Sequence, residues 1–251
     1  MTLAELIGRR PKLVGEFERL GIDFCCHGER TLAEACAAAG LPLRDALAAV
    51  TREEHSGREG IYTANWPELR LADLVDHIEE VHHRYLHLEL ASLIALSCKV
   101  LSLHGNRHPE LNDVDRLVSN LRDDFVPHLA SEERVVFPAI RELAAGRSGF
   151  AFGSIANPTA GLMADHEAVG DSFRELREVT SDYVAPPDAC QSYRRLYERL
   201  AAVESDTHVH VMKESSFLFP RAVELEAAIT EAESGAHGDL PRDEGAAGTA
   251  F

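Results

Sequence analysis

Apolar residues along this chain recur every three or four positions, which is the spacing of one face of an α-helix. One stripe runs through Leu71, Leu74, Val75 and Ile78. Two others are Leu117, Leu121, Val135, Val136 and Ile140, and Tyr193, Leu196, Tyr197, Leu200 and Val203. No stretch alternates between apolar and polar residues in the manner of a β-strand. The pattern therefore predicts an all-α protein.

Glycine and proline divide the chain into two parts. Residues 1–55 are predicted to form a small helical domain with helices over 3–20, 31–39 and 42–54. Gly21 and Gly40 follow the first two of these helices, where glycine often ends a helix. Thr31 and Glu34 have the spacing of a capping box, in which the two side chains satisfy free backbone amides at a helix start.

A longer helical domain is predicted for residues 68–230, after a linker at 56–67. Its helices are expected near 68–104, 111–145, 157–182 and 187–230, with short connections that contain glycine or proline. This arrangement is typical of an up-and-down four-helix bundle. Residues 231–251 carry five acids against one arginine and are rich in glycine and alanine, so we expect a disordered acidic tail.

Composition narrows the function classes. The formal net charge of −17 argues against nucleic-acid binding, which needs clustered lysine and arginine. The sequence contains no run of eighteen apolar residues, so it predicts no membrane span. The N-terminus lacks the pattern of a signal peptide. The five cysteines are irregularly spaced and do not indicate a disulfide framework. We therefore expect a cytoplasmic protein with reduced thiols.

The chemistry is concentrated in a repeated frame, His-x-x-x-Glu-x-x-x-x-Phe-Pro. The copies are His128-Leu-Ala-Ser-Glu132-Glu-Arg-Val-Val-Phe137-Pro138 and His210-Val-Met-Lys-Glu214-Ser-Ser-Phe-Leu-Phe219-Pro220. Histidine and glutamate four apart lie on one face of a helix. Each proline falls inside a predicted helix, where it removes a backbone hydrogen bond and is expected to cause a kink. The frame therefore indicates two matching helices with ligand-bearing faces.

Two such faces turned toward each other would bring four metal-binding groups together, which indicates a two-metal site. The alternative is a polar core without metal. Helix 157–182 offers one further histidine, His166, whereas helix 68–104 offers His77, His82, His83 and His87. Spacing alone does not choose between His82 and His83. Imidazole and carboxylate ligands favour iron, manganese or zinc.

Cys25 and Cys26 form a second candidate site. A disulfide between adjacent cysteines closes a strained ring, so a dithiol is expected. With Asp23 and His27 beside it, the pair is suited to bind or pass iron, or to supply electrons. The alternative is that both cysteines are simply small buried residues.

These motifs resemble the "repair of iron centres" family, the di-iron iron–sulfur cluster repair proteins of bacteria. The repeated frame is similar to the hemerythrin-like domain of that family. The segment Gly-Ile-Asp-Phe-Cys-Cys-His-Gly at 21–28 resembles the Asp-aromatic-Cys-Cys-Gly-Gly element of its N-terminal domain, with His27 in place of a glycine. Residues 99–109 also resemble the family between its first two bundle helices. The resemblance covers nearly all of residues 1–230.

The resemblance implies a ligand set and a cofactor. The terminal ligands implied are His83, His128, His166 and His210, and the bridging carboxylates are Glu132 and Glu214. They would hold two non-haem iron ions with an oxo or hydroxo bridge. The set has one histidine fewer than oxygen-carrying hemerythrins, which leaves open positions for O₂ or nitric oxide. Asp124 and Asp165 correspond to acidic residues near the family's site.

The function implied is repair of iron–sulfur clusters damaged by nitric oxide or oxidants, through iron donation, nitric oxide reduction or both. The implied partners are damaged iron–sulfur proteins and a small ligand, nitric oxide or O₂. One alternative is a hemerythrin-like sensor or carrier of O₂ or nitric oxide without turnover, which would not need Cys25 and Cys26. Another is a structural helical bundle that is stabilised by bound zinc and has no redox role. The sequence leaves the oligomeric state open, including a homodimer formed through the N-terminal domain.

Overall fold

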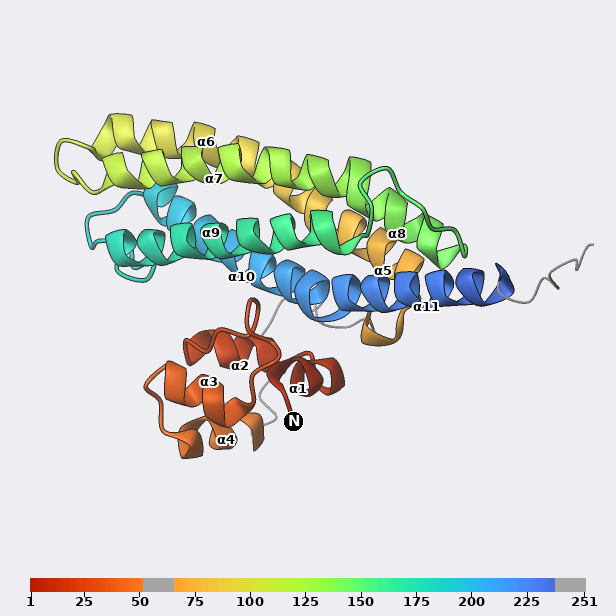
Figure 1. Cartoon of the computed structure of the whole chain (residues 1–251). Coiled ribbons are helices and arrows are strands. Elements are labelled where there is room, and N and C mark those ends of the chain that lie inside the picture. The colour runs from red at the N-terminus through yellow and green to blue at the C-terminus, as the bar shows by residue number, and fades with distance from the viewer. Residues whose placement is uncertain (52–65, 238–251) are drawn as a thin grey trace, which may run out of the picture.

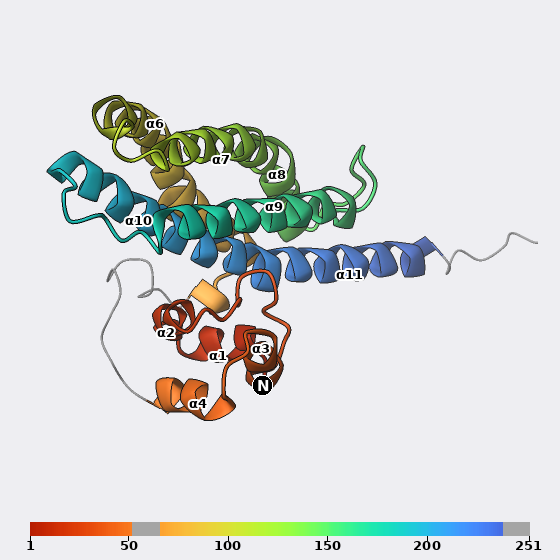
Figure 2. The same cartoon turned by 90° about the vertical axis from the view of Figure 1, so that its left-hand side faces the viewer.

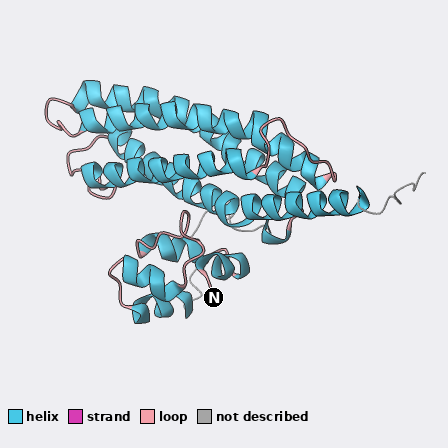
Figure 3. Ribbon diagram, viewed as in Figure 1, coloured by secondary structure: helices cyan, strands magenta, loops and turns pink. Residues whose placement is uncertain are grey.

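The computed structural model describes residues 1–51 and 66–237, which are predominantly helical (Figures 1 and 3). No β-strand occurs among these residues. The nearest approach is a pair of isolated bridges, Thr2 with Thr31 and Phe150 with Gly153. The all-α prediction is therefore confirmed.

Four long helical rods form the bundle. Their segments, in chain order, are α5 (Leu71–Ile78), η2 (Glu79–His83) and α6 (Arg84–His104); α7 (Leu111–Ser131), η3 (Glu132–Val136) and α8 (Phe137–Ala144); α9 (Ala156–Thr180); and α10 (Gln191–Lys213), η4 (Glu214–Leu218) and α11 (Phe219–His237). Helix α6 contacts α7 and α10, and α9 also contacts both α7 and α10, so the four rods close into a ring. The connections are short, as an up-and-down bundle requires.

Three of the rods contain a five-residue π-helical turn. In each turn an amide bonds to the carbonyl five residues earlier: Arg84 to Glu79, Phe137 to Glu132 and Phe219 to Glu214. Such turns recur at functional sites because the extra residue redirects side chains. Pro138 and Pro220 follow directly, in the first turn of the next α-helix, where a missing amide hydrogen costs little. The turns therefore accommodate the two prolines.

The N-terminal domain contains α1 (Leu3–Arg9), α2 (Leu13–Arg19), α3 (Leu32–Ala38) and α4 (Leu43–Thr51). The predicted single helix over 3–20 is wrong. Pro11 disfavours the helical conformation of the residue before it, and Arg10 accordingly has φ −143° and ψ 75°. The capping box of Thr31 and Glu34 is present as predicted.

Two predicted boundaries also shift. Trp66, assigned to the linker, is 1% exposed and packs edge-on against Phe217 at a ring-centroid distance of 4.8 Å. Helix α11 runs to His237, so the first residues of the predicted tail are helical. Residues 56–65 of the linker and 238–251 of the tail lie outside the described residues.

The apolar core has two halves. One half fills the α6–α7–α9–α10 end of the bundle and includes Leu86, Phe125 and Leu129. The other joins the α5, α8 and α11 end to the N-terminal domain, so that Phe17 and Phe219 belong to one cluster. Accordingly, the N-terminal domain lies against the bundle beside α10 and α11 (Figure 2). The predicted ligands lie near the positions at which each rod passes from one half of the core to the other.

The rod Leu71–His104 is long and apolar enough to cross a membrane by length and composition, with a mean hydropathy of 1.6 in its best window. Its buried Leu86, Leu90 and Leu93 pack in the bundle core. Only 28% of that window is buried, so packing in the core accounts for one face of this helix and leaves other apolar residues of the run at the surface.

Candidate metal centre

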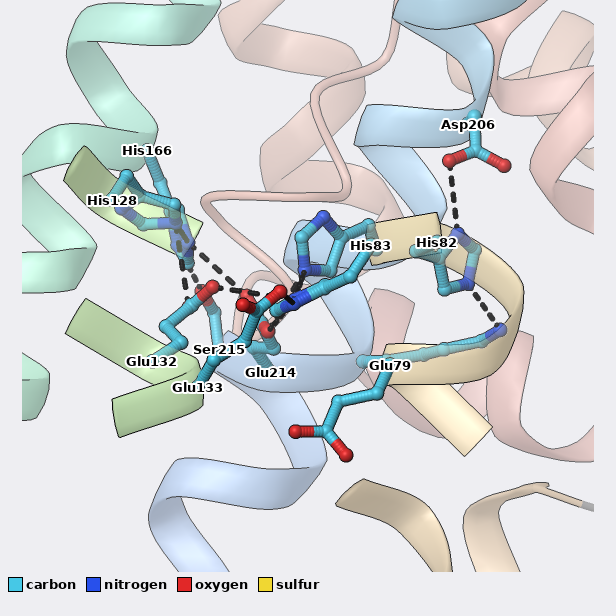
Figure 4. Close-up of polar contacts among 12 residues, drawn as sticks. Glu79, His82, His83, His128, Glu132, Glu133, His166, Asp206, Glu214 and Ser215 are labelled. Atoms are coloured by element: carbon cyan, nitrogen blue, oxygen red, sulfur yellow. Dashed lines mark hydrogen bonds and ion pairs between the residues drawn. The ribbon is translucent and has the colours of Figure 1, made fainter. Parts of the chain in front are cut away.

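Six buried side chains from the four rods converge at the junction of the two core halves, and Figure 4 labels all of these except His210. They are His83 at the end of η2, His128 in α7, Glu132 in η3, His166 in α9, His210 in α10 and Glu214 in η4. None is more than 4% exposed. The structure thus brings together all six residues that the resemblance implies.

The first half of the cluster contains His83 and His210. Their Nε2 atoms lie 3.2 Å apart. His83 Nε2 is 3.4 Å from Glu132 Oε2, and His210 Nε2 is 2.9 Å from Glu214 Oε1. Two imidazole nitrogens therefore face the same small volume as one oxygen from each glutamate.

The second half contains His128 and His166, arranged in the same way. Their Nε2 atoms are also 3.2 Å apart. His128 Nε2 is 3.3 Å from Glu132 Oε1, and His166 Nε2 is 3.2 Å from Glu214 Oε2. Each glutamate therefore turns one oxygen to each half, which is the arrangement of two bridging carboxylates.

The donor atoms fit a pair of metal ions. Both oxygens of Glu132, Oε2 of Glu214 and Nδ1 of His210 are buried without a hydrogen-bond partner among the described residues. Burying such polar atoms costs free energy unless each has a hydrogen-bond partner or a nearby opposite charge. Cations bound between the two carboxylates would supply that charge. Two nitrogens bound at about 2.1 Å and at right angles to one ion lie about 3.0 Å apart, close to the spacing seen here. The site suits iron, manganese or zinc.

The carboxylates also dominate the electrostatics of the cluster. Burial opposes the charged form of His83, but Glu132 and Glu214 outweigh it and raise its pKa to about 10. The same competition raises the pKa of His128 to about 9. Although burial opposes it, the histidines around Glu214 hold the pKa of that carboxyl well below its usual value. Metal binding would replace protons on these imidazoles and release them.

Three neighbouring side chains orient the ligand imidazoles. Nδ1 of His83 is 3.0 Å from Glu133, Nδ1 of His128 is 3.2 Å from Asp165, and Nδ1 of His166 is 3.2 Å from the hydroxyl of Ser215. Such contacts set the tautomer of a ligand histidine. Sequence reasoning missed Glu133 and Ser215. Each of them comes directly after a glutamate of the repeated frame, Glu132 or Glu214, and this common position was the available signal.

His82 lies outside the cluster, in a buried chain of polar groups. Lys213 Nζ is 2.8 Å from its Nε2 and 3.0 Å from Nε2 of His77. An ammonium only donates, so both Nε2 atoms accept, and His82 Nδ1–H donates to Asp206 at 3.0 Å. Burial lowers the pKa of Lys213 to about 7. His82 is therefore hydrogen-bonded to Lys213 and Asp206, whereas His83 faces the cluster. Spacing alone did not distinguish these two histidines.

Two hollows reach the cluster from outside. One, of about 430 Å³, is lined by His83, His87 and Glu133 among others. The second, of about 310 Å³, is lined by His128 with Asp124 and Asp165. Each half of the cluster therefore has a ligand histidine at the wall of a hollow, and acidic groups beside it.

The cysteine pair lies in the loop between α2 and α3. The sulfurs of Cys25 and Cys26 are 3.7 Å apart, and both are free thiols. Cys26, burial and Asp23 together raise the pKa of the Cys25 thiol well above its usual value. A Cβ added to Gly28 would collide with Ser216 Oγ, so this loop closely approaches the π-turn that carries Glu214.

Comparison with known proteins assigns both parts of the chain. Residues 73–222 match the family described as the hemerythrin HHE cation binding domain, and residues 1–53 match a domain of unknown function, DUF542. The iron-sulfur cluster repair protein ScdA of Staphylococcus epidermidis is 30% identical over 220 residues, which is 87% of this chain and 96% of that protein. The chain belongs to the hemerythrin-type iron-sulfur cluster repair family.

Other members of the repair family align over the same length. The ScdA protein of Staphylococcus haemolyticus is 30% identical over 86% of this chain and 95% of its own. The iron-sulfur cluster repair protein YtfE of Cronobacter sakazakii is 27% identical over 88% of this chain and 95% of its own. The order of the two domains is thus that of the repair family, and the resemblance based on the motifs is confirmed.

Proposed function

We propose that this protein repairs damaged iron–sulfur clusters, using two non-haem iron ions held by His83, His128, Glu132, His166, His210 and Glu214. The observation that carries the proposal is the sharing of both glutamates between two pairs of histidines. A pair of imidazoles and two shared carboxylates give each ion four protein donors. Iron commonly takes six, so positions remain for an external ligand.

A pair of iron ions would supply releasable iron and open positions for nitric oxide. The six side chains would bind the ions, and the bundle core would enclose them. The four imidazoles are neutral ligands, so the two carboxylates would compensate only part of the charge of two divalent ions. Glu133 and Asp165 accept hydrogen bonds from His83 and His128 at the walls of the two hollows. Through these hollows, small molecules and water would approach the ions.

Two modes of repair fit this site. Either iron held by these residues would be passed to a damaged cluster, or a ferrous pair held there would supply the two electrons that, with two protons from solvent, convert two molecules of nitric oxide to nitrous oxide and water. The relatives named as iron-sulfur cluster repair proteins support iron–sulfur proteins as targets. We place the protein in the cytoplasm, where such targets and reduced thiols occur.

The ligand assignment is tested by iron content. We expect about two irons per chain, and loss of at least one in Glu132→Ala and Glu214→Ala. His83→Ala should also lose iron, whereas its neighbour His82→Ala serves as the matched control and should keep most of it. The measurement is iron quantification with an absorption spectrum. Zinc in place of iron, or iron lost from His82→Ala but kept by His83→Ala, would contradict the assignment.

The mode of repair needs a separate experiment. Protein loaded with ⁵⁷Fe is mixed with an enzyme whose [4Fe–4S] cluster has been damaged by nitric oxide, and the enzyme's activity and ⁵⁷Fe content are followed. Donation places ⁵⁷Fe in the recovered cluster, whereas nitric oxide reduction produces nitrous oxide without label transfer. Reversible O₂ or nitric oxide binding with no recovery would instead indicate a carrier or sensor.

A further inference from the structure

The cleft between the N-terminal domain and the bundle is separate from the hollows that reach the histidine cluster. It encloses about 550 Å³ and is lined on one side by Asp23, Cys25 and Cys26. The opposite wall is formed by α9 and α10, with Glu167 and His208 among its residues. Acidic side chains outnumber the two arginines on the walls of this cleft. It is therefore an environment that favours cations.

The loop presents three donor atoms in one place. Cys25 Sγ lies 3.7 Å from Cys26 Sγ and 3.4 Å from Asp23 Oδ1. Two thiolates bound at about 2.3 Å to a tetrahedral ion lie about 3.8 Å apart, and a thiolate and a carboxylate oxygen lie about 3.5 Å apart. Two of the three separations therefore match those between corners of a tetrahedral metal site, and all three donor atoms lie within 4.8 Å of one another.

The surrounding contacts hold this geometry. Ile22 and Phe24, on either side of Asp23, are almost fully buried and anchor the loop in the core. The Cys26 amide donates to Asp23 Oδ1 at 3.2 Å, and His27 Nδ1 lies 2.8 Å from Asp23 Oδ2. His27 thus fixes one oxygen of the carboxylate while the other oxygen faces Cys25.

We propose that Asp23, Cys25 and Cys26 form a second, mononuclear site for a thiophilic divalent cation, with Fe²⁺ as its occupant in this protein. His27 is a positioning residue that orients Asp23. The fourth corner faces the cleft and has no protein ligand assigned to it. Structural sites of this type are closed by four protein ligands, so an open corner suits a metal that is held briefly and exchanged.

This site is independent of the ligands of the histidine cluster. Its loop nevertheless touches Ser216, two residues after Glu214, through the close approach at Gly28. Iron leaving or reaching the dinuclear centre would therefore have a thiolate site in a loop that contacts η4. That role in iron transfer rests on the proposed function, but metal binding by the dithiol does not.

The test uses Co²⁺ as a spectroscopic probe, added without oxygen to the full-length, iron-loaded protein with its thiols reduced. We expect one equivalent to produce a sulfur-to-cobalt charge-transfer band. The band should be lost in Cys25→Ser and in Cys26→Ser, and an excess of Fe²⁺ should compete it away, since Fe²⁺ binds a given site more weakly than Co²⁺. Cys98→Ser, which removes an exposed thiol elsewhere, is the matched control and should retain it.

Two further variants separate a metal site from general thiol effects. Asp23→Asn should weaken Co²⁺ binding because it removes the carboxylate ligand, and His27→Ala should raise the Kd by about 10–100-fold as expected for an orienting partner. Melting temperatures of all variants confirm that they fold. Absence of the band in the wild type, or its persistence in either cysteine variant, overturns the proposal.

The outcome does not depend on the dinuclear centre. The double variant Glu132→Ala/Glu214→Ala lacks the bridging carboxylates but should show the same sulfur-to-cobalt band. Loss of the band only in that variant would place the cobalt at a site other than the dithiol and would contradict the inference. A wild-type protein that holds zinc in the histidine cluster would contradict the proposed function and leave the dithiol site standing.

Discussion

A buried lysine beside the histidine cluster shows how strongly the core shifts the pKa of a single side chain. Lys213 is fully buried, lies 5.5 Å from the ring centroid of Trp66, and contacts two histidines. Burial disfavours its charged form and lowers its pKa from 10.5 to about 7. In the same way burial and Lys213 lower the pKa of His77 to about 4. These neutral imidazoles are therefore able to accept hydrogen bonds from Lys213.

The pKa of Lys213 predicts a pH dependence of stability. Between pH 7 and 10.5 the unfolded chain holds a proton on this lysine that the folded chain has released, so stability rises with pH in that window. In metal-free protein, the unfolding free energy of wild type minus that of Lys213→Met should rise by up to about 1.4 kcal/mol per pH unit. Urea titrations at several pH values measure it. The exposed Lys99→Met is the control, and parallel pH profiles for wild type and Lys213→Met would contradict the prediction.

At the scale of the elements, the repeated frame does more than provide ligands. Its phenylalanines pack against histidines from the other two rods: Phe137 lies 5.2 Å from the ring of His83, and Phe219 stacks on His166 at 6.3 Å. Each copy therefore carries one histidine and one glutamate of the cluster, and a phenylalanine that packs against a cluster histidine of another rod. The π-turn between glutamate and phenylalanine sets this spacing.

We expect Phe137→Leu to loosen His83 while keeping an apolar side chain in the core. Loss of an orienting contact lowers metal affinity by about 10–100-fold in comparable sites, and we expect the lower end of that range here. The measurement is the rate of iron loss to a chelator. Phe173→Leu removes the same volume from the other half of the core and is the control. Equal rates of iron loss from both variants would show that packing on His83 is unimportant.

At the scale of the whole molecule, the N-terminal domain docks on the turn that carries Glu214. Trp66 and the region around Gly8 pack on Phe217, and Glu18 accepts a hydrogen bond from Ser205 at 3.1 Å. The apolar core runs from this domain into the bundle without interruption. A disturbance of the cysteine loop is therefore transmitted to η4 by direct contact.

The approach of Gly28 to Ser216 makes this docking testable. Gly28→Ala should destabilise the protein by about 1–2 kcal/mol because the added methyl group meets the Ser216 hydroxyl, and adding Ser216→Ala should restore part of the loss. Thermal unfolding of the single and double variants gives the coupling. Gly161→Ala, at a position with open space around it, should cost nothing. Additive effects of the two substitutions would argue against the contact.

The sequence by itself determined the all-α class, the bundle and the repeated frame, because helix periodicity and ligand spacing are local properties. Motif resemblance added the choice of His83 and the repair family. Only the tertiary structure decided that the six side chains meet in two halves sharing both glutamates, and that Lys213 is buried beside them. The split of the helix predicted over 3–20 had a local signal in Pro11. The π-turns and the docking of the cysteine loop did not, because they depend on how distant segments pack against one another.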